Sequence, residues 1–130
     1  MAKAPVISIV DDDKSVREAT KALVRSLGYT AATFASAEEY LQSERARDTS
    51  CLILDVQMPG MNGVDLQERL IADGVRTPVI FMTAFPEDRT RARALGAGAV
   101  GFLSKPFDDE RLIECLDKAL GTRASEPAEQ

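Results

Sequence analysis

Short apolar segments alternate with longer amphipathic segments along the whole chain, and this alternation constrains the fold more than any other feature of the sequence. Five segments have the length and composition of strands: residues 6–10, 29–34, 51–54, 79–82 and 99–103. In a chain of 130 residues, strands that alternate with helices predict one α/β domain with a parallel sheet covered by helices on both faces. Right-handed crossovers leave few topologies, and we expect the flavodoxin-like strand order 2-1-3-4-5.

The segments between the predicted strands carry helix signals. Apolar residues recur at helical spacing in residues 14–27, and Gly28 ends that helix. Ser36 and Glu39 have the spacing of a capping box, so a second helix begins there. Residues 43–50 are polar and are predicted to form a loop. Further helices are expected after the turn at residues 59–63, from Pro86 to Gly96, and from Asp108 to Leu120.

The composition excludes several classes of protein. With 21 acidic and 16 basic residues, the chain has a net charge of −5, which argues against nucleic-acid binding. Its apolar runs are too short to span a bilayer and its N-terminus does not resemble a signal peptide, so we expect a cytoplasmic protein without membrane contact. It has no histidine, which excludes Ser-His-Asp and Cys-His catalysis and histidine metal ligands. Cys51 and Cys115 lie in apolar stretches and are expected to be reduced, buried thiols.

Polar side chains follow the strong predicted strands at the point where each one ends. They are Asp11 and Asp12 after the first strand, Asp55 after the third, Thr83 after the fourth and Lys105 after the fifth. Because parallel strands end at one edge of the sheet, and ligands bind there beside the switch point between strands 1 and 3, these side chains should cluster. Each one alone has an ordinary explanation as a cap, a turn hydroxyl or a solvated lysine. Their joint placement at four strand ends favours a functional site.

The carboxylates of this cluster predict a metal site. Two carboxylates about 5 Å apart repel each other by roughly 3 kcal/mol at an effective dielectric constant of 20. Mg²⁺ offsets such repulsion, because it prefers oxygen ligands and binds one or two carboxylates together with phosphate. We expect Asp12 and Asp55 to ligate Mg²⁺ directly, and Asp11 to contact it through water.

The same groups are suited to phosphoryl transfer, which needs a nucleophile, in-line positioning and charge neutralisation. Asp55 is the candidate nucleophile and would form an acyl phosphate. Lys105 and Mg²⁺ would neutralise the phosphoryl oxygens, while the Thr83 hydroxyl and the Ala84 backbone N–H would donate hydrogen bonds to them. Pro106 constrains the backbone after Lys105, and the bond between them is a candidate for the cis isomer.

Four segments resemble the receiver domain of two-component response regulators in their order and spacing. They are Ile-Val-Asp-Asp at 9–12, Leu-Asp-Val-Gln-Met-Pro-Gly-Met-Asn-Gly at 54–63, Met-Thr-Ala at 82–84 and Lys-Pro-Phe at 105–107. The resemblance extends over residues 6–120, and the middle segments are similar to those of FixJ-type receivers. It implies that residues 1–121 form one phosphoacceptor domain, and residues 122–130 are expected to be a flexible tail.

This resemblance implies a role for each acidic residue of the cluster. Asp55 is the phosphoacceptor. Mg²⁺ is bound by Asp12, by Asp55 and by the backbone carbonyl of Gln57, with Asp11 contacting it indirectly. The chain would then catalyse its own phosphorylation and dephosphorylation without turning over an external substrate.

The resemblance also implies how the signal leaves the site. Lys105 binds the phosphoryl group, Thr83 is the switch hydroxyl that moves toward it, and Phe102 is the switch aromatic that swings inward behind Thr83. Periodicity alone fits Phe102 equally well as an ordinary core aromatic. Phe85 stands two residues after Thr83, where many receivers carry a small or polar residue. We hypothesise that its ring shields the acyl phosphate from water and slows hydrolysis.

The implied partners are a sensor histidine kinase, which donates the phosphoryl group, and an unidentified protein or output domain. The face formed by helix 4, strand 5 and helix 5 would control that target, and a phosphorylation-linked homodimer is a further expectation. Arg89 and Arg93 lie four residues apart and share a helix face, which is either solvated or part of this docking surface. The chain is either a single-domain regulator or part of a longer one.

Two alternative functions remain open at the level of sequence. A phosphatase of the haloacid-dehalogenase type also uses an Asp nucleophile, a hydroxyl, a Lys and Mg²⁺, but it needs an Asp two residues after the nucleophile. Gln57 occupies that position and cannot transfer protons. A phosphorylation-independent adaptor would keep the fold without needing the complete cluster.

Overall fold

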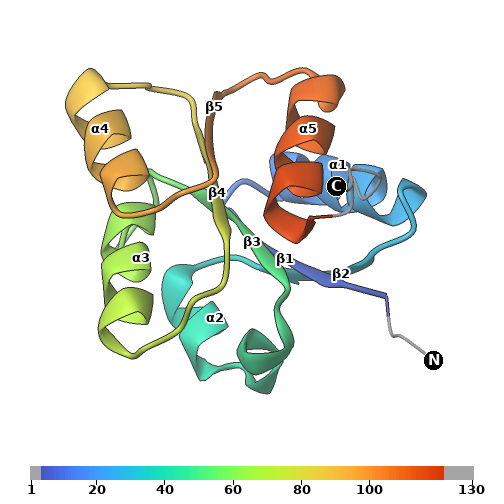
Figure 1. The fold of residues 1–130 in the computed structure, drawn as a ribbon, viewed down its shortest axis with the longest axis horizontal. Helices are drawn as coiled ribbons and strands as arrows, with labels where there is room; N and C mark the ends of the chain where they lie inside the picture. Colours follow the sequence, from blue (N-terminus) through green and yellow to red (C-terminus); the bar gives the residue numbers. More distant parts are fainter. Residues whose placement is uncertain (1–3, 122–130) are drawn as a thin grey trace, which may run out of the picture.

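The computed structural model describes residues 4–121, and their five parallel strands form one sheet in the order β2-β1-β3-β4-β5 (Figure 1). The strands are β1 (Val6–Val10), β2 (Thr30–Phe34), β3 (Cys51–Asp55), β4 (Val79–Thr83) and β5 (Gly101–Ser104). The helices are α1 (Lys14–Ser26), α2 (Ala37–Gln42), α3 (Gly63–Ala72), α4 (Asp88–Gly96) and α5 (Asp109–Leu120). The predicted flavodoxin-like topology is confirmed. The tail predicted for residues 122–130 lies outside the described residues.

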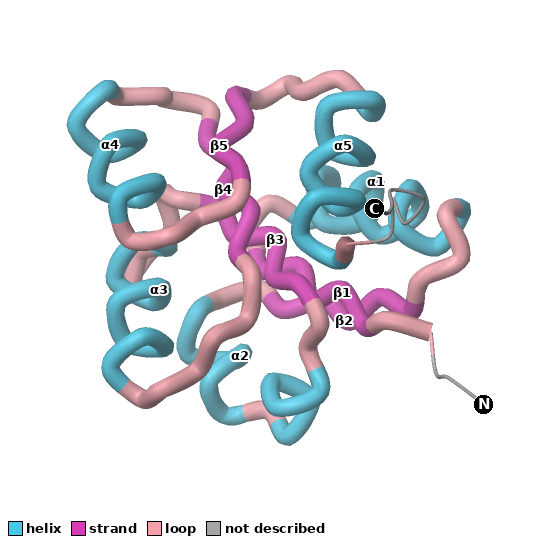
Figure 2. Tube along the Cα trace, viewed as in Figure 1, coloured by secondary structure: helices cyan, strands magenta, loops and turns pink. Residues whose placement is uncertain are grey.

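Helices cover both faces of the sheet, with α1 and α5 on one face and α2, α3 and α4 on the other (Figure 2). The central strand β3 is buried along its whole length. Cys51 and Ile53 join the core beneath α1 and α5, while Leu52 and Leu54 join the opposite core. Each buried side chain of this kind contributes about 1.5–3 kcal/mol. The end of β3, and with it Asp55, is therefore firmly anchored.

One segment predicted as a loop is partly helical. Within residues 43–50 the chain forms a 3₁₀ helix, Glu44–Asp48. The hydroxyl of Tyr40, which is buried, donates to the carbonyl of Ala46 at 3.3 Å and lies 3.2 Å from the Thr49 hydroxyl. Thr49 Oγ1 is in turn 2.6 Å from the Ser8 hydroxyl of β1. These contacts order a segment whose polarity alone predicts a loop.

Two boundaries near the end of the sheet differ from the sequence prediction. Helix α4 begins at Asp88, so Pro86 precedes the helix instead of occupying its first turn. The cause lies at the end of β4, where the Phe85 N–H is bonded to the Thr83 hydroxyl at 3.0 Å and the backbone turns before it can become helical. Strand β5 begins at Gly101 because the preceding residues complete the end of α4, the Ala99 N–H being bonded to the helix carbonyl of Ala94 at 3.1 Å.

Both cysteines are free thiols, as predicted. Cys51 is fully buried, and its burial raises the pKa of the thiol to about 12, so the thiol stays protonated. Cys115 is only half-buried, because it lies on α5 at the edge of the core. The prediction of complete burial is therefore correct for Cys51 alone.

Candidate functional site

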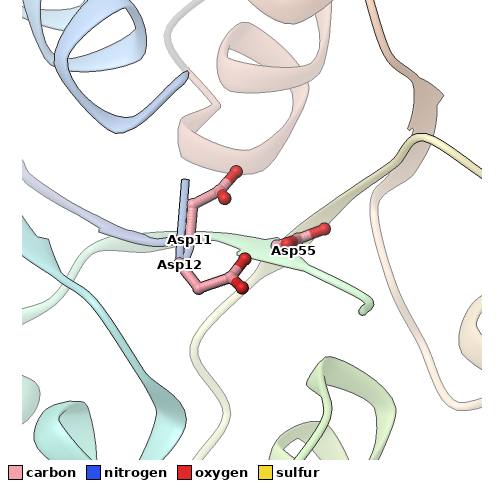
Figure 3. Close-up of side chains that lie close together, drawn as sticks. All are labelled: Asp11, Asp12 and Asp55. Carbon is pink, nitrogen blue, oxygen red and sulfur yellow. The ribbon is translucent and has the colours of Figure 1, made fainter. Parts of the chain in front are cut away.

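Three carboxylates meet where β1 and β3 end (Figure 3). Val10 of β1 pairs with Leu54 of β3, so the residues that follow them come together at one edge of the sheet. One carboxylate oxygen from each of Asp11, Asp12 and Asp55 lies within 4.8 Å of the other two. Asp11 is fully buried and Asp55 is 3% exposed, whereas Asp12 lies open to solvent. The three carboxylates predicted to meet at the strand ends are therefore close together.

The start of α1 holds Asp11 in place. Asp13 caps the helix, its side chain accepting from the backbone N–H groups of Ser15 and Val16. The Asp13 N–H in turn donates to Asp11 Oδ1 at 2.9 Å, and Arg17 Nη1 donates to the Asp11 carbonyl at 2.8 Å. One oxygen of the Asp11 carboxylate is therefore committed to the backbone.

Lys105 reaches the cluster from the end of β5. Its Nζ lies 2.9 Å from Asp11 Oδ2 and 3.4 Å from Asp55 Oδ1, with 15% of the side chain exposed. Its backbone N–H donates to the Thr83 carbonyl at 2.7 Å, and the bond to Pro106 is cis. Burial lowers the pKa of Lys105, but the hydrogen bond to Asp11 and the charges of Asp11 and Asp55 outweigh burial, so the pKa is raised. The lysine is therefore charged at neutral pH.

One lysine does not balance three carboxylates. Burial, followed by the negative charge of Asp11, raises the pKa of Asp55 from 3.8 to about 7, although the Lys105 ammonium opposes this rise. Asp12 adds a smaller effect in the same direction. The side chains of the site thus carry an excess of negative charge at the end of β3.

The end of β4 supplies a buried hydroxyl. Thr83 is fully buried, and its Oγ1 donates to the side-chain carbonyl of Gln57 at 2.6 Å while it accepts from the Phe85 N–H at 3.0 Å. Ala84 is exposed just beyond it. The side chain of Phe85 is 69% exposed. The hydrogen bond to Gln57 was not predicted, because sequence assigned a role only to the backbone carbonyl of that residue.

Phe102 of β5 lies between core and surface. Its ring packs against Phe81 of β4, with centroids 6.1 Å apart, and the side chain is partly buried against the core beneath α2, α3 and α4. It also lines a surface hollow of about 400 Å³ together with Arg91 and Arg111. Arg91 of α4 therefore lies beside β5 and the start of α5.

Of the two interpretations of Arg89 and Arg93, a solvated face or part of the docking surface, the structure favours the solvated one for Arg93, whose side chain is about half exposed. Its guanidinium forms an ion pair with Glu68 of α3, with 2.6 Å between Nη2 and Oε2. The spacing of four residues correctly places two arginines on one side of a helix. It does not indicate which neighbouring element that side meets, and here Arg93 meets α3.

Two contacts hold the end of the β3–α3 loop where α3 begins. At Gly63, which begins α3, a β-carbon would overlap the Asp55 carbonyl oxygen, so only glycine allows this close approach. The Met61 N–H donates to Glu38 Oε2 at 3.0 Å, and this bond lowers the pKa of Glu38. Sequence reasoning missed Glu38, because the contact joins residues 23 apart and has no periodic signal.

Comparison with known proteins agrees with this geometry. A family model described as the response regulator receiver domain matches residues 7–117. The response regulator protein TodT of Pseudomonas putida is 42% identical over 118 residues, which are 91% of this chain and 52% of TodT. The transcriptional regulatory protein FixJ of Bradyrhizobium diazoefficiens is 34% identical over 122 residues, which are 94% of this chain and 58% of FixJ. The chain thus spans little more than half the length of these relatives.

Solved structures share the fold as well. The structure of response regulator StyR matches with a TM-score of 0.85 at 40% sequence identity, covering 95% of this chain and 62% of that one. The similarity therefore extends from the local motifs around the acidic cluster to the arrangement of the whole sheet.

Proposed function

The chain belongs to the family of response-regulator receiver domains of two-component systems, and from this membership we propose that Asp55 is its phosphoacceptor. Receiver domains of response regulators are phosphorylated by histidine kinases and regulate output domains. One observation carries the proposal for this chain: the Asp55 carboxylate lies among two further carboxylates and 3.4 Å from Lys105 Nζ.

The chemistry follows from these groups. A carboxylate oxygen of Asp55 attacks the phosphorus of a phosphohistidine, the P–N bond breaks, and the imidazole leaves with the bonding electrons. The product is an acyl phosphate on Asp55. Such a transfer depends on positioning and charge neutralisation more than on covalent assistance. Lys105, which is charged and beside the acceptor, neutralises part of the phosphoryl charge. The chain would in this way catalyse its own modification.

The acidic cluster fits Mg²⁺. One oxygen from each of the three carboxylates lies within 4.8 Å of the other two. Burial and the negative charge of Asp11 both raise the pKa of Asp55, and a bound cation would offset both effects. Because Asp11 is already bonded to the Asp13 N–H and to Lys105, we assign it contact through water. The direct ligands of Mg²⁺ would then be the carboxylates of Asp12 and Asp55 and the backbone carbonyl of Gln57. When bound, Mg²⁺ supplies positive charge to the carboxylates and to the incoming phosphoryl oxygens.

The conformational change that follows phosphorylation involves Thr83 at the end of β4 and Phe102 in β5. The Thr83 hydroxyl and the Ala84 N–H donate to the phosphoryl group, and Phe102 moves inward as Thr83 is drawn toward Asp55. The contact between the Phe81 and Phe102 rings supports this route, because Phe102 already lies against the neighbouring strand. The face formed by α4, β5 and α5 would thereby change its affinity for an output domain, a protein partner or a second copy of the chain.

We assign the chain to the cytoplasm with a sensor histidine kinase as phosphodonor and without direct contact to nucleic acid. Every helix within residues 4–121 is too short or too polar to cross a membrane. The excess of acidic over basic residues fits a protein partner better than nucleic acid.

Mass spectrometry after incubation with acetyl phosphate and Mg²⁺ tests the proposal. The wild-type chain should gain one labile phosphoryl group, Asp55→Asn should gain none, and Asp65→Asn, which alters an exposed carboxylate on α3, should behave as wild type. Repeated turnover of the donor would indicate a phosphatase instead, although Gln57 cannot serve as its general acid. If the chain is not modified and does not hydrolyse the donor, it acts as an adaptor.

A further inference from the structure

The Thr83 hydroxyl makes two hydrogen bonds to neighbouring groups of the chain. Its single hydrogen is donated to Gln57 Oε1 at 2.6 Å, a short bond for two oxygen atoms. The hydroxyl oxygen also accepts the Phe85 N–H at 3.0 Å. Thr83 is fully buried, so its hydroxyl depends on these partners within the chain and not on bulk water.

These bonds restrict what Thr83 can do. A hydroxyl has one O–H to donate. Thr83 therefore cannot donate to Gln57 and to a phosphoryl oxygen at the same time. The two hydrogen bonds are mutually exclusive, whereas the bond from the Phe85 N–H is compatible with either.

We propose that Gln57 is a positioning residue whose side chain holds Thr83 in the resting state, so that phosphorylation of Asp55 must exchange the Thr83–Gln57 hydrogen bond for one to the phosphoryl group. This inference rests on the proposed function, since it concerns the switch at that same site. It adds to Gln57 a side-chain role that is separate from the backbone carbonyl assigned to the metal.

The surroundings of Gln57 allow this exchange. Its side chain is exposed, in contrast to the buried Thr83 that it holds. A hollow of about 540 Å³ between the β3–α3 loop and α4 is lined in part by Gln57, Asn62 and Thr90. A released Gln57 amide thus has solvent and polar neighbours to bond with, and the exchange leaves no polar group buried without a partner.

The first test concerns the metal-free, unphosphorylated protein. In Gln57→Met the side chain keeps its length but loses the acceptor, so NMR should show an altered χ1 coupling of Thr83 and a shifted Phe85 amide. In Gln57→Glu the acceptor oxygen is kept, so both signals should remain close to wild type. Unchanged Thr83 signals in Gln57→Met would overturn the proposal. This readout does not depend on whether Asp55 is ever phosphorylated.

The second test uses beryllofluoride with Mg²⁺ as a mimic of the phosphoryl group. A hydrogen bond of this kind contributes about 1 kcal/mol, so Gln57→Met should bind beryllofluoride about fivefold more tightly than wild type. In a Thr83→Ala background the same substitution should change the affinity less than twofold. An equal gain in both backgrounds would mean that Gln57 acts through the metal and not through Thr83, and would refute the proposal. Failure of every variant and of wild type to bind beryllofluoride would instead count against the phosphoacceptor function.

Discussion

Replacing Asp55, the proposed phosphoacceptor, should stabilise the protein in the absence of divalent cations. The pKa of Asp55 is raised from 3.8 to about 7 by burial and by Asp11, which means that ionised Asp55 opposes folding. A shift of this size corresponds to about 4 kcal/mol at 1.36 kcal/mol per unit. Asp12 leaves one side of the cluster open to water, and Lys105 loses a partner when the charge is removed. Solvent screening and this loss reduce the gain to about 2 kcal/mol for Asp55→Asn.

The pH dependence of this gain has a definite sign. Below pH 3.8 the carboxyl group is protonated in both the folded and the unfolded chain, so the substitution changes little. Between about pH 4 and pH 7 the unfolded chain releases the proton first, and the wild type loses stability relative to Asp55→Asn as the pH rises. Above about pH 7 the difference is complete. The advantage of Asp55→Asn should therefore be larger at pH 8 than at pH 5.

Urea unfolding with a chelator present measures this difference. Asp65→Asn is the matched control, because it removes an exposed carboxylate and should change the stability by less than about 0.5 kcal/mol. Saturating Mg²⁺ should stabilise the wild type more than Asp55→Asn and narrow the gap. If Asp55→Asn were less stable than wild type at pH 8 without divalent cations, the electrostatic account of the site would be wrong.

Three further substitutions probe the surroundings of Asp55. Lys105→Met leaves Asp11 buried without its ion-pair partner. The free energy of unfolding, measured with urea at pH 8, should fall by about 2 kcal/mol, and phosphorylation by acetyl phosphate should be about tenfold slower. An unchanged free energy of unfolding would exclude a structural role for the ion pair. Glu38 accepts the Met61 N–H, so the NMR shift of the Met61 amide should follow the titration of the Glu38 carboxyl group, with a midpoint below its ordinary pKa of 4.5. This pH dependence should disappear in Glu38→Gln. A midpoint at or above 4.5 would contradict the contact. Phe85→Ala should speed loss of the phosphoryl group, and an equal or slower rate would refute the shielding hypothesis.

The parts of the fold that depend on periodicity could be predicted from sequence. The continuous apolar run in β3 indicated a strand buried on both faces, and the parallel arrangement then placed Asp11, Asp12 and Asp55 at one edge without knowledge of any side-chain contact. Lys105 followed from the same argument, because β5 ends at that edge. Topology fixes where a strand ends, and this is sufficient to assemble the acidic cluster.

The parts that depend on side-chain direction could not be predicted. The ion pair between Arg93 and Glu68 could not be predicted, since helical spacing does not specify which element a helix face meets. The contact from Glu38 to Met61 and the hydrogen bond from Thr83 to Gln57 join segments that are 23 and 26 residues apart. Such contacts depend on how the helices and loops pack around the sheet, and they leave no local pattern in the sequence.

Under the proposed function, the charge of the site gives a reason for phosphorylation of Asp55 to move Thr83. Acyl phosphate formation replaces the single charge of Asp55 with up to two charges on phosphoryl oxygens, beside Asp11 and Asp12 and with only Lys105 already in place. The additional charge favours any conformation that brings another hydrogen-bond donor to the phosphoryl group. The equilibrium between two conformations shifts only by the difference in their interaction with that group. Thr83 can provide that donor only by leaving Gln57. The excess charge at Asp55 and the hydrogen bond to Gln57 therefore act in opposite directions on one hydroxyl group, and their difference in free energy sets how completely phosphorylation changes the conformation.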